Sequence, residues 1–263
     1  MRPVIIIQAR MGSTRLPGKV LKPILGQPML WHIARRLRGI SSVADVVVAT
    51  SASPSDQPIL DFCRTQGIPV AAGSELDVLD RFYRTALQYE ADPVIRVTGD
   101  CPLVDPELIE RLLALYRAGD YDHVGIATGA GALFLEGGRF PDGLDAECFS
   151  FSALKQAWRE ATAMSDREHV TPYLWRQPER FRLDLLKSPT DYSDLRWTVD
   201  TEQDFALIVQ IYAALYQENH LFLMADVLDY LEQHPELTQF NNALIGKEGY
   251  REVWDPDRSD CSI

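Results

Sequence analysis

The sequence predicts an α/β protein built on a mostly parallel, twisted sheet with helices on both faces. Short apolar runs alternate with segments of helical periodicity from the first residues to about residue 118. Turn residues such as Gly, Pro and Ser separate these segments, and polar turns rich in glycine or carboxylates follow two of the apolar runs. Alternation of strand and helix is typical of parallel sheets, in which ligands collect at the carboxyl ends of the strands.

The elements can be placed from their periodicity and from their end signals. Met29, Ile33 and Leu37 recur at helical spacing, and Asp105 before Pro106 is a typical helix start. In the first half we expect strands at 4–8, 43–49, 68–71 and 94–98, with helices at 28–37, 58–66, 77–89 and 106–118. In the second half we expect strands at 123–128, 140–149, 181–186 and 195–199, and helices at 152–163, 201–215 and 224–233.

The organisation expected is one α/β domain over residues 1–247. A subregion at about 129–187 breaks the regular alternation, and a polar, turn-rich tail occupies 248–263. No internal repeat and no low-complexity segment is apparent.

Composition excludes several classes of partner. With 26 basic and 38 acidic residues the net charge is −12, which opposes broad binding to nucleic acid or to an anionic membrane. No apolar run approaches the ~20 residues of a membrane span, and the N-terminus does not have the pattern of a secretory signal. Four cysteines show no C-x-x-C spacing, so neither zinc nor a disulfide framework is indicated, and we expect a cytoplasmic protein.

The loop after the first predicted strand carries the main functional signal. It reads Ala-Arg-Met-Gly-Ser-Thr-Arg-Leu-Pro-Gly-Lys over residues 9–19. Glycines allow close approach of backbone N–H groups to an anion, and three cations supply charge, so the loop suits a polyphosphate. It is not a P-loop, because five residues separate Gly12 from Gly18 and Val20 follows Lys19. The dinucleotide fingerprint G-x-G-x-x-G is also absent.

The pattern A-R-x-x-S-T-R-L-P-G-K resembles the signature loop of sugar-activating cytidylyltransferases, which include the enzymes that make CMP-sialic acid and CMP-Kdo. The likeness is strongest to the cytidylyltransferase family of spore-coat polysaccharide synthesis. It implies a nucleotide-diphospho-sugar transferase-like, Rossmann-like fold, CTP and a sugar-type acceptor as substrates, and a homodimer with a possible contact at 132–135. Nucleotide-binding positions by this resemblance are Ala9, Arg10, Met11, Gly12, Ser13, Lys19, Gly73, Ser74, Asp77, Arg81 and Thr98.

Two aspartates are candidate ligands of Mg²⁺ or another divalent metal. Asp100 lies in Gly-Asp-Cys-Pro just past the strand at 94–98, and Asp200 lies in Val-Asp-Thr-Glu-Gln-Asp. Magnesium favours one or two protein carboxylates together with phosphate oxygens and water. Asp100 could instead cap its own turn, and Asp200 or Thr201 could cap the following helix. Both tracts resemble the metal-binding elements of the family, which favours the ligand role.

The tract 73–81 resembles the part of the family that encloses the base and the ribose. Glycine and serine suit close backbone approach. Asp77 and Asp80 could alternatively be favourable charges at a helix N-terminus, with Arg81 paired to one of them. These residues do not by themselves distinguish cytosine from uracil.

The second half is expected to hold the acceptor. Asp142, Glu147 and His169 lie in tracts similar to the spore-coat family and could bind sugar hydroxyls or assist deprotonation of the attacking oxygen. Capping and surface hydrogen bonding are the alternative roles. Cys101 is better explained as a small apolar side chain than as a nucleophile. Arg139 is the single cation in 129–147, so no set of cations for a sugar carboxylate is apparent and the acceptor stays open.

The reaction implied is in-line attack of an acceptor oxygen on the α-phosphorus of CTP with loss of pyrophosphate. Arg10, Arg15 and Lys19 would offset charge on the phosphates. The product would be a CMP-sugar for surface polysaccharide or glycoconjugate synthesis. One alternative is a glycosyltransferase of the same fold, although the D-x-D motif typical of that class is missing after Asp100. Another is a catalytically silent binding module, which the intact cations and both aspartates oppose.

Overall fold

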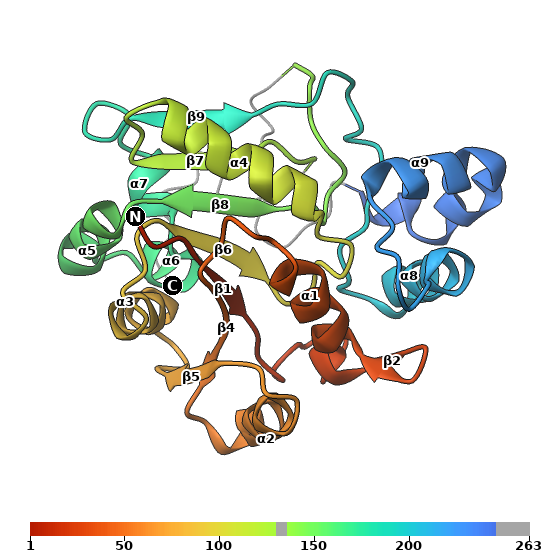
Figure 1. Ribbon diagram of the computed structural model, residues 1–263, viewed down its shortest axis with the longest axis horizontal. Helices are drawn as coiled ribbons and strands as arrows, with labels where there is room; N and C mark the ends of the chain where they lie inside the picture. The colour runs from red at the N-terminus through yellow and green to blue at the C-terminus, as the bar shows by residue number, and fades with distance from the viewer. Residues whose placement is uncertain (130–135, 246–263) are drawn as a thin grey trace.

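The computed structural model describes residues 1–129 and 136–245, and within them seven strands form one sheet (Figure 1). Their order across the sheet is β5-β4-β1-β6-β8-β7-β9, and β8 runs antiparallel to both of its neighbours while the other pairs are parallel. The mostly parallel sheet is therefore confirmed. The strands are β1 (Val4–Gln8), β4 (Asp45–Ser51), β5 (Val70–Gly73), β6 (Val94–Thr98), β7 (His123–Ile126), β8 (Ala146–Phe149) and β9 (Leu183–Leu186).

Helices cover both faces of the sheet because the central strands are apolar on both sides. In β1, Ile5 and Ile7 belong to one core, whereas Val4 and Ile6 belong to the other. The first core is completed by α1 (Met29–Arg38), α2 (Gln57–Thr65), α4 (Pro106–Ala118), α8 (Glu202–Leu215) and α9 (Met224–Gln233), of which α1 and α4 lie in front of the sheet in Figure 1. The second core is covered by α3 (Val78–Gln88), α5 (Phe151–Glu160), α6 (Met164–His169) and α7 (Pro172–Trp175).

The ends of the helices follow from local sequence. The side chain of Asp105 accepts a hydrogen bond from the N–H of Glu107 at 2.8 Å, and Pro106 occupies the first turn of α4. Ser150 caps α5 in the same way through the N–H of Ala153. The expected bounds of α4 and α9 agree with the structure.

The expected strand at 195–199 is wrong. This segment is extended, but it forms only an isolated bridge between Arg196 and Asp142. The N–H of Trp197 donates to the carbonyl of Asp142, and the N–H of Val199 donates to the carbonyl of Asp100. Its backbone N–H groups therefore bind the loops that carry Asp142 and Asp100 instead of pairing with a neighbouring strand.

The expected strand at 140–149 is shorter than predicted, because Gly143 takes a φ of 100° and a Cβ there would lie 2.4 Å from the backbone nitrogen of Thr198. The sequence also did not predict α6, α7 or the small hairpin of β2 (Pro23–Ile24) and β3 (Gln27–Pro28). Short 3₁₀ helices occupy Lys19–Leu21, Pro54–Asp56, Pro235–Phe240 and Asn242–Leu244.

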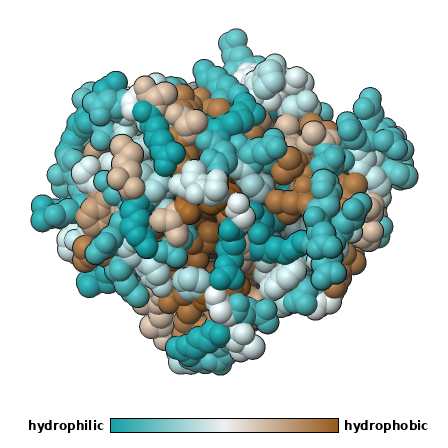
Figure 2. Space-filling model, viewed as in Figure 1, coloured by the Kyte–Doolittle hydropathy of each residue, from teal (hydrophilic) through white to brown (hydrophobic). Residues whose placement is uncertain are grey.

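The surface agrees with the charged composition of the chain. On the face seen in Figure 2, hydrophilic residues predominate around the rim and hydrophobic residues show between them. No helix in residues 1–129 and 136–245 combines the length and apolar character needed to cross a membrane. The expected dimer contact at 132–135 and the tail at 248–263 lie outside the described residues.

Candidate functional site

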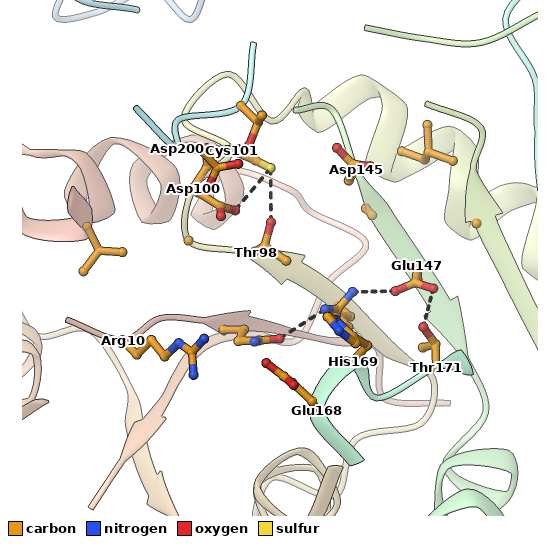
Figure 3. Close-up of a pocket in the computed structure, with 18 of the residues that line it drawn as sticks. Arg10, Thr98, Asp100, Cys101, Asp145, Glu147, Glu168, His169, Thr171 and Asp200 are labelled. Atoms are coloured by element: carbon orange, nitrogen blue, oxygen red, sulfur yellow. Dashed lines mark hydrogen bonds and ion pairs between the residues drawn. The ribbon is translucent and has the colours of Figure 1, made fainter. Parts of the chain in front are cut away.

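A cavity of about 570 Å³ opens where β1 and β6 end, as expected for a parallel sheet (Figure 3). One end is lined by the loop after β1 and by the turns that carry Asp100 and Asp200. The other end is lined by β6, β7, β8 and the segment from α6 to α7. We call these the loop end and the distal end.

The loop after β1 is held by its own backbone. The carbonyl of Met11 accepts hydrogen bonds from the N–H groups of Ser13 and Gly18, at 2.9 and 3.1 Å, and the N–H of Met11 donates to Asp56 at 2.7 Å. Gly18 has a φ of 69°, a left-handed conformation that glycine adopts without strain. Five predicted residues of this loop line the cavity, namely Arg10, Gly12, Ser13, Arg15 and Lys19, and Thr14, which was not predicted, joins them. Ala9 and Met11 shape the loop without lining the cavity.

Lys19 brings the two predicted metal ligands together. Its Nζ donates to Asp100 Oδ2, Asp200 Oδ1 and the carbonyl of Val199, each at 2.8 Å. The three N–H donors of the ammonium are thereby all used. Carboxylates that are 100 residues apart in sequence therefore surround one buried cation.

Asp200 reaches this point because the segment before α8 is fastened to the turn after β6. The N–H of Val199 donates to the carbonyl of Asp100 at 2.8 Å. Thr201, not Asp200, caps α8, and Asp204 completes the capping box. The carboxylate of Asp200 is consequently left for Lys19 and for Arg15, whose guanidinium lies 2.9 Å away.

The electrostatics keep Asp100 and Lys19 ionised. Burial alone would raise the pKa of Asp100, but the Lys19 ammonium lowers it to about 2. Burial would likewise lower the pKa of Lys19, but Asp100 and Asp200 raise it. Two carboxylates around one cation position are a donor set that suits magnesium. No group of three or more His, Cys, Asp or Glu side chains poised for a metal occurs in the described part of the chain.

The predicted base-binding tract lies beside the cavity rather than on its wall. Asp77 caps α3 through the N–H of Asp80 and forms an ion pair with Arg167. Ser74 accepts from Arg81 through its carbonyl at 2.7 Å, and a Cβ at Gly73 would press on the Arg81 side chain at 3.1 Å. Close backbone approach at Gly73 thus serves the packing of Arg81.

Arg81 has spare hydrogen-bonding capacity in a buried place. It is 1% exposed, and its Nε and Nη2 have no partner among the described residues. The Oγ1 of Thr50, at the end of β4, is also buried without one. Burial and the nearby charge of Arg10 lower the pKa of Arg81 to about 10. Buried donors without partners are costly, so this position suits a polar ligand group.

The distal end centres on Glu147. Its carboxylate accepts from Arg96 Nη1 at 2.7 Å and from Thr171 Oγ1 at 2.7 Å, and it lies 3.0 Å from His123 Nε2. Burial alone would raise the pKa of Glu147, but the bond with His123 and the charge of Arg96 lower it to about 2. His169 lines the cavity beside this network, and burial together with Arg96 lowers its pKa.

Asp142 does not lie with the other two predicted acceptor residues. It is 3% exposed, it is absent from the cavity wall, and it forms an ion pair with Arg196 at 3.2 Å. Arg196 also holds Asp204 and Asp200, at 2.9 and 3.2 Å. Asp142 therefore belongs to the buried support beneath Asp200.

Among the residues of the cavity wall that were not predicted from the sequence are Arg96, Asp145 and Trp175. Arg96 and Thr98 share one face of β6, because side chains two residues apart in an extended chain point the same way. For the same reason Asp145, directly before β8, shares a face with Glu147. The two-residue repeat of a strand, together with the cation Arg96 inside the apolar run 94–98, was the signal by which these residues could have been predicted. Trp175 was missed because it lies at the end of α7, a helix that was not predicted from the sequence.

Comparison with known proteins identifies the family to which the chain belongs. The cytidylyltransferase family model matches residues 4–248. An uncharacterized protein of Methanocaldococcus jannaschii is 34% identical over 260 residues, covering 96% of this chain and 99% of its own. The spore coat polysaccharide biosynthesis protein SpsF of Bacillus subtilis is 34% identical over 218 residues, covering 80% and 85%. A cytidylyltransferase structure from Leptospira borgpetersenii superposes with a TM-score of 0.82 at 29% identity, covering 91% and 98%. The chain belongs to the cytidylyltransferase family.

Proposed function

We propose that the protein transfers the cytidylyl group of CTP to a hydroxyl of a sugar-type acceptor and releases pyrophosphate. The observation that carries the proposal is a cavity in which the glycine loop, three cations and two aspartates meet. Family membership supports CTP as the nucleotide. The named role of the Bacillus subtilis relative supports a product used in surface polysaccharide synthesis.

The roles of the residues follow from their places. Arg10, Arg15 and Lys19 would bind the phosphates and offset the charge that develops on the α-phosphate and on the leaving pyrophosphate. Arg81, with its spare donors, would lie beyond the loop end and donate hydrogen bonds to polar groups of the nucleoside. Glu147 and His169 would contact the acceptor at the distal end.

The chemistry is a single displacement. The acceptor oxygen forms a bond to the α-phosphorus, the bond from that phosphorus to the bridging oxygen of the β-phosphate breaks, and the hydroxyl proton is released to solvent. Such transfer depends mainly on positioning and charge neutralisation. The loop would hold the phosphates in line with the distal end, where the acceptor binds.

Asp100 and Asp200 would hold magnesium in this reaction. The structure supports this assignment because both carboxylates already surround a cation, the Lys19 ammonium. Bound magnesium supplies charge neutralisation at phosphate oxygens. Transfer of Lys19 from the aspartates to the triphosphate would free Oδ2 of Asp100 and Oδ1 of Asp200 for the metal.

The test is nucleotide binding and pyrophosphate release with CTP, ATP, GTP and UTP, with magnesium and a panel of sugar acceptors. We expect binding and release specific to CTP, with release lost in Asp100→Ala and kept in Asp61→Ala, an exposed aspartate on α2. Equal use of all four nucleotides would contradict the proposal. Binding of a sugar nucleotide in place of CTP would favour the glycosyltransferase alternative.

A further inference from the structure

We infer that Val170 is a positioning residue for the distal end of the cavity, because its strained backbone fixes His169 before it and Thr171 after it. This role rests on the proposed function, in which the distal end binds the acceptor. It adds a residue that does not itself line the cavity. The observations that carry it are the backbone angles and the hydrogen bonds of the segment that joins α6 to α7.

The backbone at Val170 forms a turn that is rare in proteins. Its φ is 75° and its ψ is −53°, and the N–H of Thr171 donates to the carbonyl of His169 at 2.9 Å. A hydrogen bond that spans one residue with these angles is a γ-turn with a positive central φ, which is the strained form. A β-branched residue at positive φ is an outlier, whereas glycine adopts such angles without strain. The position therefore carries strain that a glycine would remove.

The place of this strain in the molecule points to the cavity. Three residues other than glycine have a positive φ in the described part of the chain, namely Leu25, Glu90 and Val170. Leu25 and Glu90 lie in turns away from the cavity wall, and neither is β-branched. Val170 lies between two residues of that wall. Backbone strain of this kind is concentrated at functional sites.

Several contacts hold the strained turn in place. The N–H of Val170 donates to the carbonyl of Asp166 at 3.1 Å, and the valine side chain is buried in the second core. Thr171 Oγ1 donates to Glu147 Oε1 at 2.7 Å, a bond drawn in Figure 3. The carbonyl of Thr171 accepts from the N–H of Leu174 at 2.8 Å and so begins α7. The turn is therefore fixed to α6, to β8 and to α7 at once.

The turn brings its two neighbours to one wall. His169 ends α6 and Thr171 directly precedes α7, and both line the distal end. In a continuous helix, side chains two residues apart would point to nearly opposite sides. A residue with a Cβ has only a small allowed region at positive φ, whereas glycine has a broad one. Val170 thus restricts the relative placement of His169 and Thr171 in a way that glycine would not.

The first test separates strain from packing. Val170→Gly and Val170→Ala both remove the γ-methyl groups, but only the alanine keeps a Cβ. We expect Val170→Gly to be the more stable variant, with a folding equilibrium constant at least about threefold larger by urea unfolding. Val227 in α9 is the matched control, since it is equally buried and lies outside the cavity wall. There the glycine variant should be the less stable one, and the same order at Val170 would overturn the strain argument.

The second test uses His169 as a reporter of placement. Burial and the charge of Arg96 lower its pKa below the ordinary 6.5. The other charged groups that act on it are Arg176, Glu168 and Glu147. NMR titration, assigned with His169→Gln, should show this pKa rising toward 6.5 in Val170→Gly, because the ring is held less firmly. It should stay at the wild-type value in Val170→Ala and in Val227→Gly. An unchanged titration in Val170→Gly would contradict the positioning role.

Kinetics complete the comparison, with the acceptor that the panel of sugars identifies. For this acceptor, kcat/KM should fall at least about fivefold in Val170→Gly and less than about twofold in Val170→Ala. The Kd for CTP should be unchanged in both. Equal losses in the two variants would show that Val170 serves stability alone. If CTP does not bind to the wild type, the proposed function fails; if CTP binds and the two variants behave alike at His169, only the positioning role fails.

Discussion

The Nζ atom of Lys19 lies 2.8 Å from Oδ2 of Asp100, although the loop and the turn that carry them are separated by six predicted elements of the chain. This contact joins the candidate phosphate loop to the candidate metal site. The side chain of Lys19 is 10% exposed, so its charge acts where solvent screens it little. The two parts of the site are therefore electrostatically dependent on one another.

Replacement of Lys19 should lower activity, whereas replacement of a lysine outside the cavity should not. Lys19→Ala removes a cation that we propose offsets phosphate charge, and we expect kcat/KM for pyrophosphate release to fall by about 10²- to 10³-fold. Lys22→Ala is the matched control, since Lys22 pairs with Glu202 and does not line the cavity. A variant at Lys19 that retains nearly full activity would contradict the assignment.

Ionised Glu147 should make the free energy of unfolding fall as the pH is lowered into the acidic range. Its folded pKa of about 2 is below the ordinary value of 4.5, so the unfolded chain binds more protons between these values. The stabilisation is complete above about pH 4.5 and is lost as the pH falls toward 2. Urea unfolding from pH 3 to 7 should show a steeper fall in the free energy of unfolding for the wild type than for Glu147→Gln.

Glu147→Gln should also lower the free energy of unfolding near pH 7, by about 1–3 kcal/mol, because the Arg96 guanidinium loses its ionised partner. Glu179→Gln should leave both the pH slope and the stability unchanged. Identical slopes for Glu147→Gln and the wild type would show that the network does not depend on an ionised Glu147.

Asp142 should act on stability and not on the acceptor. Asp142→Asn weakens its buried ion pair with Arg196, and we expect a loss of about 1–3 kcal/mol in the free energy of unfolding. The KM for the acceptor should stay unchanged. Asp191→Asn, which affects a more exposed pair with Arg139, should cost under about 1 kcal/mol. A raised KM with unchanged stability in Asp142→Asn would restore Asp142 as an acceptor residue.

Arg81 should contribute to nucleotide affinity. Arg81→Met removes the buried donors that have no protein partner, so CTP should bind about tenfold more weakly or worse, by calorimetry. Arg84→Met, on the exposed side of α3, removes only a surface pair with Asp80 and should bind CTP normally. Normal CTP affinity in Arg81→Met would place the base elsewhere.

Much of the fold follows from short-range patterns. The run 94–98 and the helix 106–118 are bounded by signals within a few residues, and both agree with the structure. The segment 195–199 was misjudged because an apolar extended run is typical of a strand, whereas here its backbone is bound by Asp142 and Asp100. Partners that lie 50 to 100 residues away leave no local signal.

The candidate site shows the same division. The loop at 9–19 and the two aspartates could be chosen from sequence, and the structure brings Arg15, Lys19, Asp100 and Asp200 together. Asp142 and Asp145 lie in one acidic tract, and only the left-handed turn at Gly143 decides that Asp142 faces the buried support. The partners of Arg96 could not be predicted, since they depend on the pairing of β6 with β8.

The order of strands in the sheet has a consequence for biosynthesis. The block β5-β4-β1-β6 is complete once Thr98 has left the ribosome, so the candidate phosphate loop can form on an early nascent chain. β8 can join β6 only after residue 149 has emerged, and Asp200 follows roughly fifty residues later still. Until then Lys19 has Asp100 but lacks its second carboxylate. An unfinished chain can thus display the loop without the complete candidate site.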